Sequence, residues 1–167
     1  MIPILSVVGR SNSGKTTYLE KLITELKKRG YKIAVIKHHH SDFEFDRPGK
    51  DTWRHAQAGA EVVYLASPHK VAMIRKTDQE LPLDQIVSSI DNVDIIITEG
   101  YKAENKPKIE VFRQAAGHLP LGSKPELLAV VADTALYEGV PHYALDDVAA
   151  MADFLEHKVL NNANLKD

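Results

Sequence analysis

Two patterns of apolar positions alternate along the chain. Short continuous apolar runs are typical of strands that are buried on both faces of a sheet. Between them, apolar residues recur at helical spacing, most clearly in 15–29, which Gly30 ends. The runs that predict strands are 2–8, 32–36, 61–67, 70–76, 93–100, 108–113 and 126–133, and the segments that predict helices are 15–29, 51–58, 84–91 and 146–160. This alternation predicts a three-layer α/β fold, with a mostly parallel sheet flanked by helices.

Length and composition describe one ordinary globular domain. The chain has 167 residues, of which 44% are hydrophobic and 26% charged. We expect one domain over 1–160, a long loop over 100–125, and a frayed tail over 161–167.

Charge and hydropathy exclude several classes of partner. The net charge of −2 provides no positive field for nucleic acid or an acidic membrane, and no apolar run reaches the roughly 20 residues of a membrane helix. The first residues resemble no signal peptide, and no cysteine is available for disulfides or thiolate metal sites. We therefore expect a cytoplasmic protein that binds neither nucleic acid nor membrane.

The segment "GRSNSGKT" fills the pattern G-x-x-x-x-G-K-[ST] between a predicted strand and a predicted helix. Its glycines let successive backbone amides curl around phosphates, and the helix adds its positive end. Lys15 is expected at the β- and γ-phosphates, and the Thr16 hydroxyl at Mg²⁺. The loop residues are Gly9, Arg10, Ser11, Asn12, Ser13, Gly14, Lys15 and Thr16.

A phosphate loop of this kind requires an acidic residue near the metal, at the end of a neighbouring strand. The strand "VDIIITEG" offers Asp94 at its start and Glu99 at its end. Phosphates gather at the carboxyl ends of parallel strands, so Glu99 is the predicted metal-site and catalytic partner of Lys15.

A charged, histidine-rich stretch follows the second predicted strand. In an extended chain His38 and His40 share a face with Asp42, which makes them candidate metal ligands or members of a polar loop. Around the following Pro-Gly turn, the charged residues read either as turn chemistry or as a loop that responds to nucleotide. The candidates for this loop are His38, His39, His40, Asp46, Lys50, Asp51 and Arg54.

Four segments together resemble the molybdopterin-guanine dinucleotide biosynthesis protein B family, the adapters of molybdenum-cofactor maturation. They are "GRSNSGKTT", "VIKHHHSDFEFDRPGKDTWRHAQAGA", "IITEGYK" and "AVVADT". The resemblance implies a P-loop NTPase-like fold that binds GTP, a homodimer, and cooperation with the guanylyltransferase that joins GMP to molybdopterin. It adds Thr17 to the phosphate site, and it leaves molybdopterin, or the proteins that insert it, as further partners.

The chain also departs from common GTPase patterns. The guanine-reading Asn-Lys-x-Asp is absent, and Asp133, at the end of "LLAVVAD", is the candidate that accepts hydrogen bonds from guanine. Arg10 stands where some dimeric relatives carry an extra lysine, and it either reaches a partner's nucleotide or faces solvent.

The sequence leaves three hypotheses for the function. The favoured one is an adapter that binds GTP and Mg²⁺ and hydrolyses slowly, because the sequence places no glutamine or arginine at the γ-phosphate. The histidine run suggests a GTPase metallochaperone. A small-molecule kinase is disfavoured, because its lid usually supplies several arginines, and the arginines here are few and scattered.

Overall fold

A computed structural model describes residues 1–123 and 125–161. They form two compact units, one combining Met1–His38 with the chain from Ile90 onward, the other comprising His39–Ser89. No helix in the described ranges is long and apolar enough to cross a membrane. The single domain predicted over 1–160 stays a prediction, and the predicted tail lies, from residue 162 on, outside the described residues.

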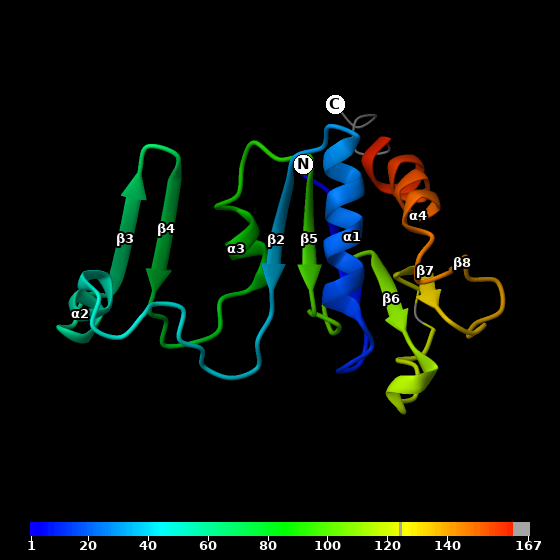
Figure 1. Cartoon of the computed structure of the whole chain (residues 1–167), viewed down its shortest axis with the longest axis horizontal. Coiled ribbons are helices and arrows are strands. Elements are labelled where there is room, and N and C mark those ends of the chain that lie inside the picture. Colours follow the sequence, from blue (N-terminus) through cyan, green and yellow to red (C-terminus); the bar gives the residue numbers. More distant parts are fainter. Residues whose placement is uncertain (124, 162–167) are drawn as a thin grey trace. The chain divides into compact units, whose positions relative to one another are not determined.

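The first unit is built on a six-stranded sheet in which every neighbouring pair is parallel. Its order is β2–β5–β1–β6–β7–β8, which puts β1 near the middle. Figure 1 labels the other five strands of this sheet. The strands are β1 Ile4–Val8, β2 Ile33–Lys37, β5 Ile95–Glu99, β6 Lys108–Phe112, β7 Leu127–Ala132 and β8 His142–Tyr143. The helices are α1 Lys15–Lys28 and α4 Val148–Leu155, with a 3₁₀ turn at Gln114–Ala116 and a π turn at Glu156–Leu160. This parallel sheet flanked by helices confirms the predicted fold class.

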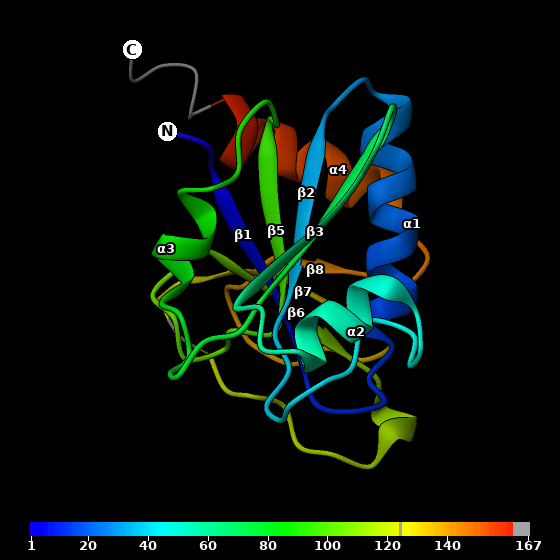
Figure 2. The same ribbon diagram turned by 90° about the vertical axis from the view of Figure 1, so that its left-hand side faces the viewer.

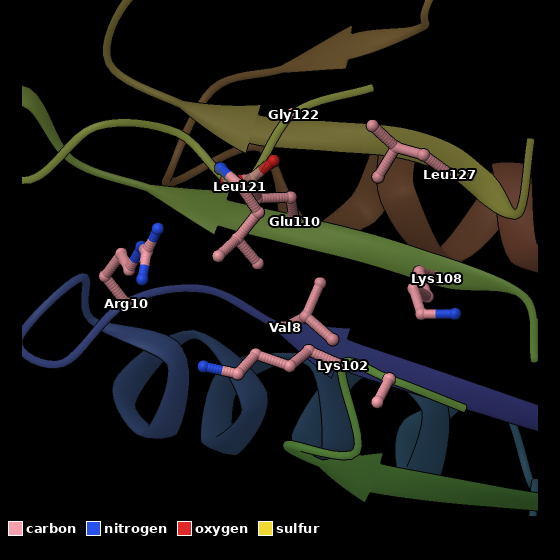
Figure 3. A pocket seen from close by; sticks show the side chains of 9 residues that line it. Val8, Arg10, Lys102, Lys108, Glu110, Leu121, Gly122 and Leu127 are labelled. Carbon is pink, nitrogen blue, oxygen red and sulfur yellow. Dashed lines mark hydrogen bonds between the residues drawn. The ribbon is translucent and has the colours of Figure 1, made fainter. Parts of the chain in front are cut away.

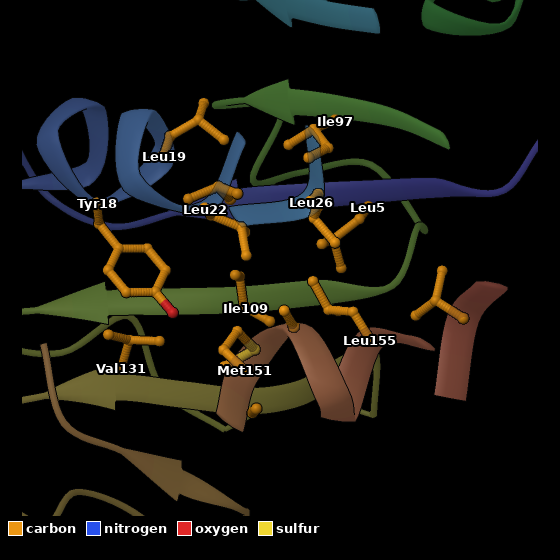
Figure 4. Close-up of a cluster of buried hydrophobic side chains, with 14 of the residues drawn as sticks. Leu5, Tyr18, Leu19, Leu22, Leu26, Ile97, Ile109, Val131, Met151 and Leu155 are labelled. Atoms are coloured by element: carbon orange, nitrogen blue, oxygen red, sulfur yellow. The ribbon is translucent and has the colours of Figure 1, made fainter. Parts of the chain in front are cut away.

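The main core lies between one face of the sheet and helices α1 and α4 (Figure 4). Alternate strand residues point to this face, and the apolar stripe of α1 packs on them. Burial of each such side chain contributes about 1.5–3 kcal/mol. The labelled core residues are Leu5, Tyr18, Leu19, Leu22, Leu26, Ile97, Ile109, Val131, Met151 and Leu155.

The opposite face of the sheet is more polar. Ser6 and Thr98 are fully buried there and joined by a 2.9 Å hydrogen bond between their hydroxyls. A smaller apolar cluster forms around Phe112 and Val130. This face therefore carries buried polar groups next to the phosphate loop, which begins where β1 ends.

The second unit contains an antiparallel hairpin, β3 Val62–Ser67 and β4 Lys70–Arg75, which forms a sheet of its own. Helix α2, Asp51–Gln57, contacts β3 at one end of this ribbon, and α3 spans Leu83–Val87 (Figure 2). The sequence predicted both strands and the turn between them, but not their separation from the parallel sheet.

Two other details differ from the expectation. The helix predicted to reach Asp91 ends at Val87, because the hydroxyls of Ser88 and Ser89 bond back to the carbonyl groups of Gln85 and Ile86, each at 2.7 Å. Strand β8 has only two residues, too few for a periodic signal to exist.

Candidate functional site

The loop between β1 and α1 has the backbone of an anion cradle. Asn12 and Gly14 adopt left-handed conformations, with φ of 61° and 88°, and Gly14 is the N-cap of α1. No side chain of the described residues caps this helix and no acidic residue lies in its first turn, so its positive end is left for a ligand. Ser11, Asn12 and Thr17 are exposed around it.

Gly9 is fixed in this loop by sterics. A Cβ atom there would lie 2.4 Å from the carbonyl oxygen of Val111 and 2.8 Å from Oγ of Ser13. The Ser13 hydroxyl is itself buried, at 2% exposure, and has no hydrogen-bond partner among the described residues. The loop therefore passes so close to β6 that only glycine fits, and it holds one unsatisfied hydroxyl.

Lys15 lies half-buried in the loop, and its ammonium donates a 2.7 Å hydrogen bond to the carbonyl oxygen of Arg10. Burial lowers the pKa of Lys15; the carboxylate of Glu99 opposes this shift, and the charges of Lys37 and Lys102 add to it. The positive charges of Lys15, Lys37 and Lys102 therefore lie close to a single carboxylate, that of Glu99. A bound anion stabilises this excess of positive charge.

Glu99, at the end of β5, lies beside Thr16, and its role at a metal stays a prediction. The Thr16 hydroxyl donates a 2.7 Å hydrogen bond to one carboxylate oxygen of Glu99, and the Lys37 ammonium lies 3.7 Å from the other. Glu99 is 9% exposed. Hydroxyl and carboxylate oxygens are the ligands that Mg²⁺ prefers, so the residues present fit a magnesium–phosphate group.

Two basic residues at this site escaped the sequence analysis. Lys37 ends β2 and pairs in register with Glu99, so the missing signal was the adjacency of β2 and β5. The Arg113 guanidinium lies 3.6 Å from the position of a Cβ on Gly14. Arg113 follows β6, which neighbours β1 in the sheet. Knowledge of the strand order would therefore have identified Arg113 as well.

The acidic candidates Asp94 and Asp133 have structural partners. Asp94 accepts a 2.6 Å hydrogen bond from the backbone N–H of Lys32, which joins the starts of β2 and β5. Asp133 follows β7 and accepts a 2.9 Å hydrogen bond from the backbone N–H of Gln114. Asp133 is exposed, so its second oxygen is open to a ligand.

The segment that follows Glu99 holds an unusual backbone. Gly100 and Tyr101 both have positive φ, 107° and 52°, which is uncommon for tyrosine. The Tyr101 ring stacks on His38 with centroids 4.5 Å apart, and a Cβ on Gly100 would lie 3.1 Å from that of His38. His38 therefore packs against the turn that carries Glu99.

The other members of the charged stretch make local contacts in the second unit. His39 bonds through Nδ1 to the carbonyl oxygen of Ser41 at 2.8 Å, and His40 is exposed. Asp46 accepts from the N–H of Arg47 at 2.8 Å.

Helix α2 takes up the rest of this stretch. Lys50 is its N-cap, and Asp51 and Arg54 form an exposed ion pair at 3.8 Å. Within 1–123 and 125–161, no three histidine or acidic side chains gather as a metal site.

Comparison with known proteins gives consistent matches. The family model for molybdopterin guanine dinucleotide synthesis protein B matches residues 4–133. The molybdopterin-guanine dinucleotide biosynthesis adapter protein of Escherichia coli K12 is 39% identical over 161 residues, which cover 93% of this chain and 92% of the relative. The adapter protein of Haemophilus influenzae is 38% identical over 159 residues, covering 93% and 89%.

Solved structures agree with the sequence matches. A crystal structure of a molybdopterin-guanine biosynthesis protein B superposes with a TM-score of 0.70 at 32% sequence identity. The superposition covers 92% of this chain and 98% of that one.

Proposed function

The chain belongs to the molybdopterin guanine dinucleotide synthesis protein B family, and from this premise we propose that it is a GTP-binding adapter in the biosynthesis of that dinucleotide. It holds GTP with Mg²⁺ at the loop Gly9–Thr17 and assists the guanylyltransferase that joins GMP to molybdopterin. The observation that carries this proposal is the 2.7 Å hydrogen bond between Thr16 and Glu99, beside Lys15.

The polar groups of the site support a bound nucleotide. The phosphates are attracted by the positive charges of Lys15 and Lys37 and by the positive end of α1. The metal takes oxygen ligands from Thr16 and Glu99. The orphaned Ser13 hydroxyl gains a partner when an anion enters the loop. When bound, Mg²⁺ neutralises phosphate charge; the protein side chains position the nucleotide and fix the geometry around it.

Slow turnover follows from the two contacts that Glu99 makes. Its two oxygens face Thr16 and Lys37, so it serves as a metal-site residue and not as a base that positions water. A small GTPase without an arginine at the γ-phosphate turns over at roughly 10⁻⁴ s⁻¹, and we propose that Arg113, which lies beside Gly14 at the start of α1, does not reach that phosphate. We therefore assign the nucleotide a conformational role, and the strained Gly100–Tyr101 turn packed on His38 is the segment that reports its state.

A homodimer is the proposed assembly, because the β3–β4 hairpin leaves apolar residues on both of its faces exposed. Tyr64 and Met73 pair in register on one face, next to Val71, and Leu65 lies on the other. Their exposures run from 46% to 64%. Isolated two-stranded sheets are marginally stable in water, so a second copy that covers this surface stabilises it. Light scattering should give the mass of a dimer at micromolar concentration, and a monomer mass would contradict this assembly.

Titration calorimetry with GTP, GDP and ATP in the presence of Mg²⁺, with phosphate release followed in the same samples, tests the proposal. We expect guanine-selective binding and turnover below about one per minute. Addition of the partner guanylyltransferase should then increase dinucleotide formation. A preference for ATP, or fast phosphate release without a partner, would instead indicate a working enzyme.

The substitution Glu99→Gln should change the metal dependence more than the binding of nucleotide itself. The amide keeps one acceptor for Thr16 but loses the charge that favours Mg²⁺. The Mg²⁺ concentration at half-maximal GTP affinity should rise by about tenfold, since hydrogen bonds to charged groups contribute about 1.5–3 kcal/mol. Asp94→Asn is the matched control, one residue before the same strand begins. An unaltered metal titration in Glu99→Gln would move the metal site elsewhere.

The substitution Asp133→Asn should reduce the preference for GTP over ATP. An asparagine retains an oxygen for the N–H of Gln114, so the 3₁₀ turn keeps its partner, but it loses the second acceptor that guanine requires. The dissociation constant for ATP divided by that for GTP, both measured by calorimetry, should fall by about tenfold. If the ratio is the same as in the unmodified protein, Asp133 is only the partner of Gln114.

A further inference from the structure

A cavity of about 280 Å³ lies on the face of the sheet that α1 does not cover (Figure 3). Its floor comes from β1 and β6, and its walls from the segments that precede β6 and β7. Val7 and Ile109 point into the core beneath α1, so Val8 and Glu110, one residue further, point to the cavity side. The cavity therefore lies on the other face of the sheet from α1, and it adjoins the phosphate loop through Arg10, whose carbonyl oxygen accepts the hydrogen bond from Lys15.

A register shift shapes one wall of this cavity. Lys108 pairs with Leu127, but Ile109 pairs with Ala129, so Leu128 is an extra residue in β7. The bulge places Leu128 in the main core and re-aims Leu127 to the opposite face, where it lines the cavity. Bulges re-aim side chains in this way beside functional sites.

A buried carboxylate holds a second wall in place. Glu110 is 1% exposed, and it accepts hydrogen bonds from the N–H of Leu121 at 2.7 Å and from the hydroxyl of Tyr137 at 2.8 Å. The same tyrosine oxygen accepts from the N–H of Gly122 at 2.8 Å. Leu121 and Gly122 both line the cavity, so the wall is fixed before any ligand arrives.

The charge of the lining is mainly basic. Among the described lining residues, Arg10, Lys102 and Lys108 are basic and only Glu110 is acidic, and both oxygens of Glu110 already accept hydrogen bonds. Lys108 is buried and donates to the carbonyl oxygens of Glu104 and Lys106, so it anchors the adjacent loop. Arg10 and Lys102 are exposed and lie at one end of the cavity (Figure 3).

From these contacts we infer that the cavity binds a small organic phosphate. Arg10 and Lys102 hold the doubly charged phosphate, and Val8, Leu121 and Leu127 contact its carbon body. An arginine and a lysine from separate loops match a dianion in charge and number of donors. The volume is at the lower limit for ligand sites, which restricts the body to about one ring. The inference does not rest on nucleotide binding at Lys15.

Phenyl phosphate is the probe, with inorganic phosphate in a parallel titration, each followed through the backbone amide signals of the labelled protein. We expect phenyl phosphate to shift the signals of Val8, Leu121 and Gly122 and to bind there at least tenfold more tightly than inorganic phosphate. Equal affinity, or shifts confined to residues 11–17, would overturn the inference, because the apolar walls would then contribute nothing.

Matched variants separate this cavity from the phosphate loop. Lys102→Ala should weaken the binding of phenyl phosphate by about tenfold. Ala103→Glu, which adds a negative charge to an exposed lining residue, should weaken it as well. Lys27→Ala, an exposed lysine near the end of α1, is the control for lost charge and should bind normally.

Lys15→Ala should weaken the binding of phenyl phosphate less than Lys102→Ala does, because Lys15 does not line the cavity and contacts it only through the backbone of Arg10. Dispersed spectra of each variant establish that it is folded. Retained affinity in both Lys102→Ala and Ala103→Glu would overturn the proposal.

Discussion

Lys15→Ala should weaken GTP binding by about 100-fold, because charge-assisted hydrogen bonds to phosphate contribute about 1.5–3 kcal/mol each. Within the part of the chain that the structure describes, the Lys15 ammonium makes a single hydrogen bond, to the carbonyl oxygen of Arg10. Burial and two neighbouring lysines disfavour its charge. Lys15 therefore serves the ligand more than the fold, and the temperature of unfolding without ligand should change by less than about 2 °C.

Calorimetry with GTP and Mg²⁺, together with thermal unfolding, measures both effects. Lys27→Ala removes the same charge at the far end of α1 and should leave GTP affinity unchanged. Unchanged affinity in Lys15→Ala would refute the assignment of the loop. A large loss of stability would instead mean that Lys15 belongs to the fold.

Gly9→Ala should be damaging for a different reason. The new Cβ would lie 2.4 Å from a backbone oxygen of β6, which cannot rotate away as a side chain can. The loop must shift, so we expect GTP affinity to fall by at least tenfold, and the free energy of unfolding to fall by about 1–3 kcal/mol, as for other overpacked sites.

Gly30→Ala separates sterics from backbone strain. Gly30 also has a positive φ, 94°, but a Cβ there meets no atom of the described residues within 4 Å. It should lose about 1 kcal/mol of stability and keep its full affinity for GTP. If the two variants bind GTP equally well, the close approach of the loop to β6 is not required for the site.

The sequence was most informative where local pattern and local structure coincide. The stripe of α1 and the glycine spacing of the phosphate loop are encoded within 30 consecutive residues, and the structure has both. Glu99 could be placed because an apolar run shows where its strand ends, and carboxyl ends of parallel strands share an edge.

Features that depend on strand order could not be read from the sequence. Lys37 reaches Glu99 because β2 pairs with β5, and Arg113 reaches the loop because β6 neighbours β1. Neither adjacency leaves a periodic signal. The cavity is less predictable still, because it needs the one-residue bulge at Leu128 and a carboxylate that bonds to a distant loop.

The order of the strands also constrains how the chain folds as it is synthesised. β1 and β2 leave the ribosome first, but within the six-stranded sheet each pairs only with strands from β5 onward. β3 pairs with β4, so this hairpin can form while β1 and β2 are still unpaired. The apolar residues of β1 and α1 therefore stay without their sheet until Ile95–Glu99 has been made. Such long-range closure is slow, and a chaperone that shields residues 1–38 during this interval should raise the yield of folded protein.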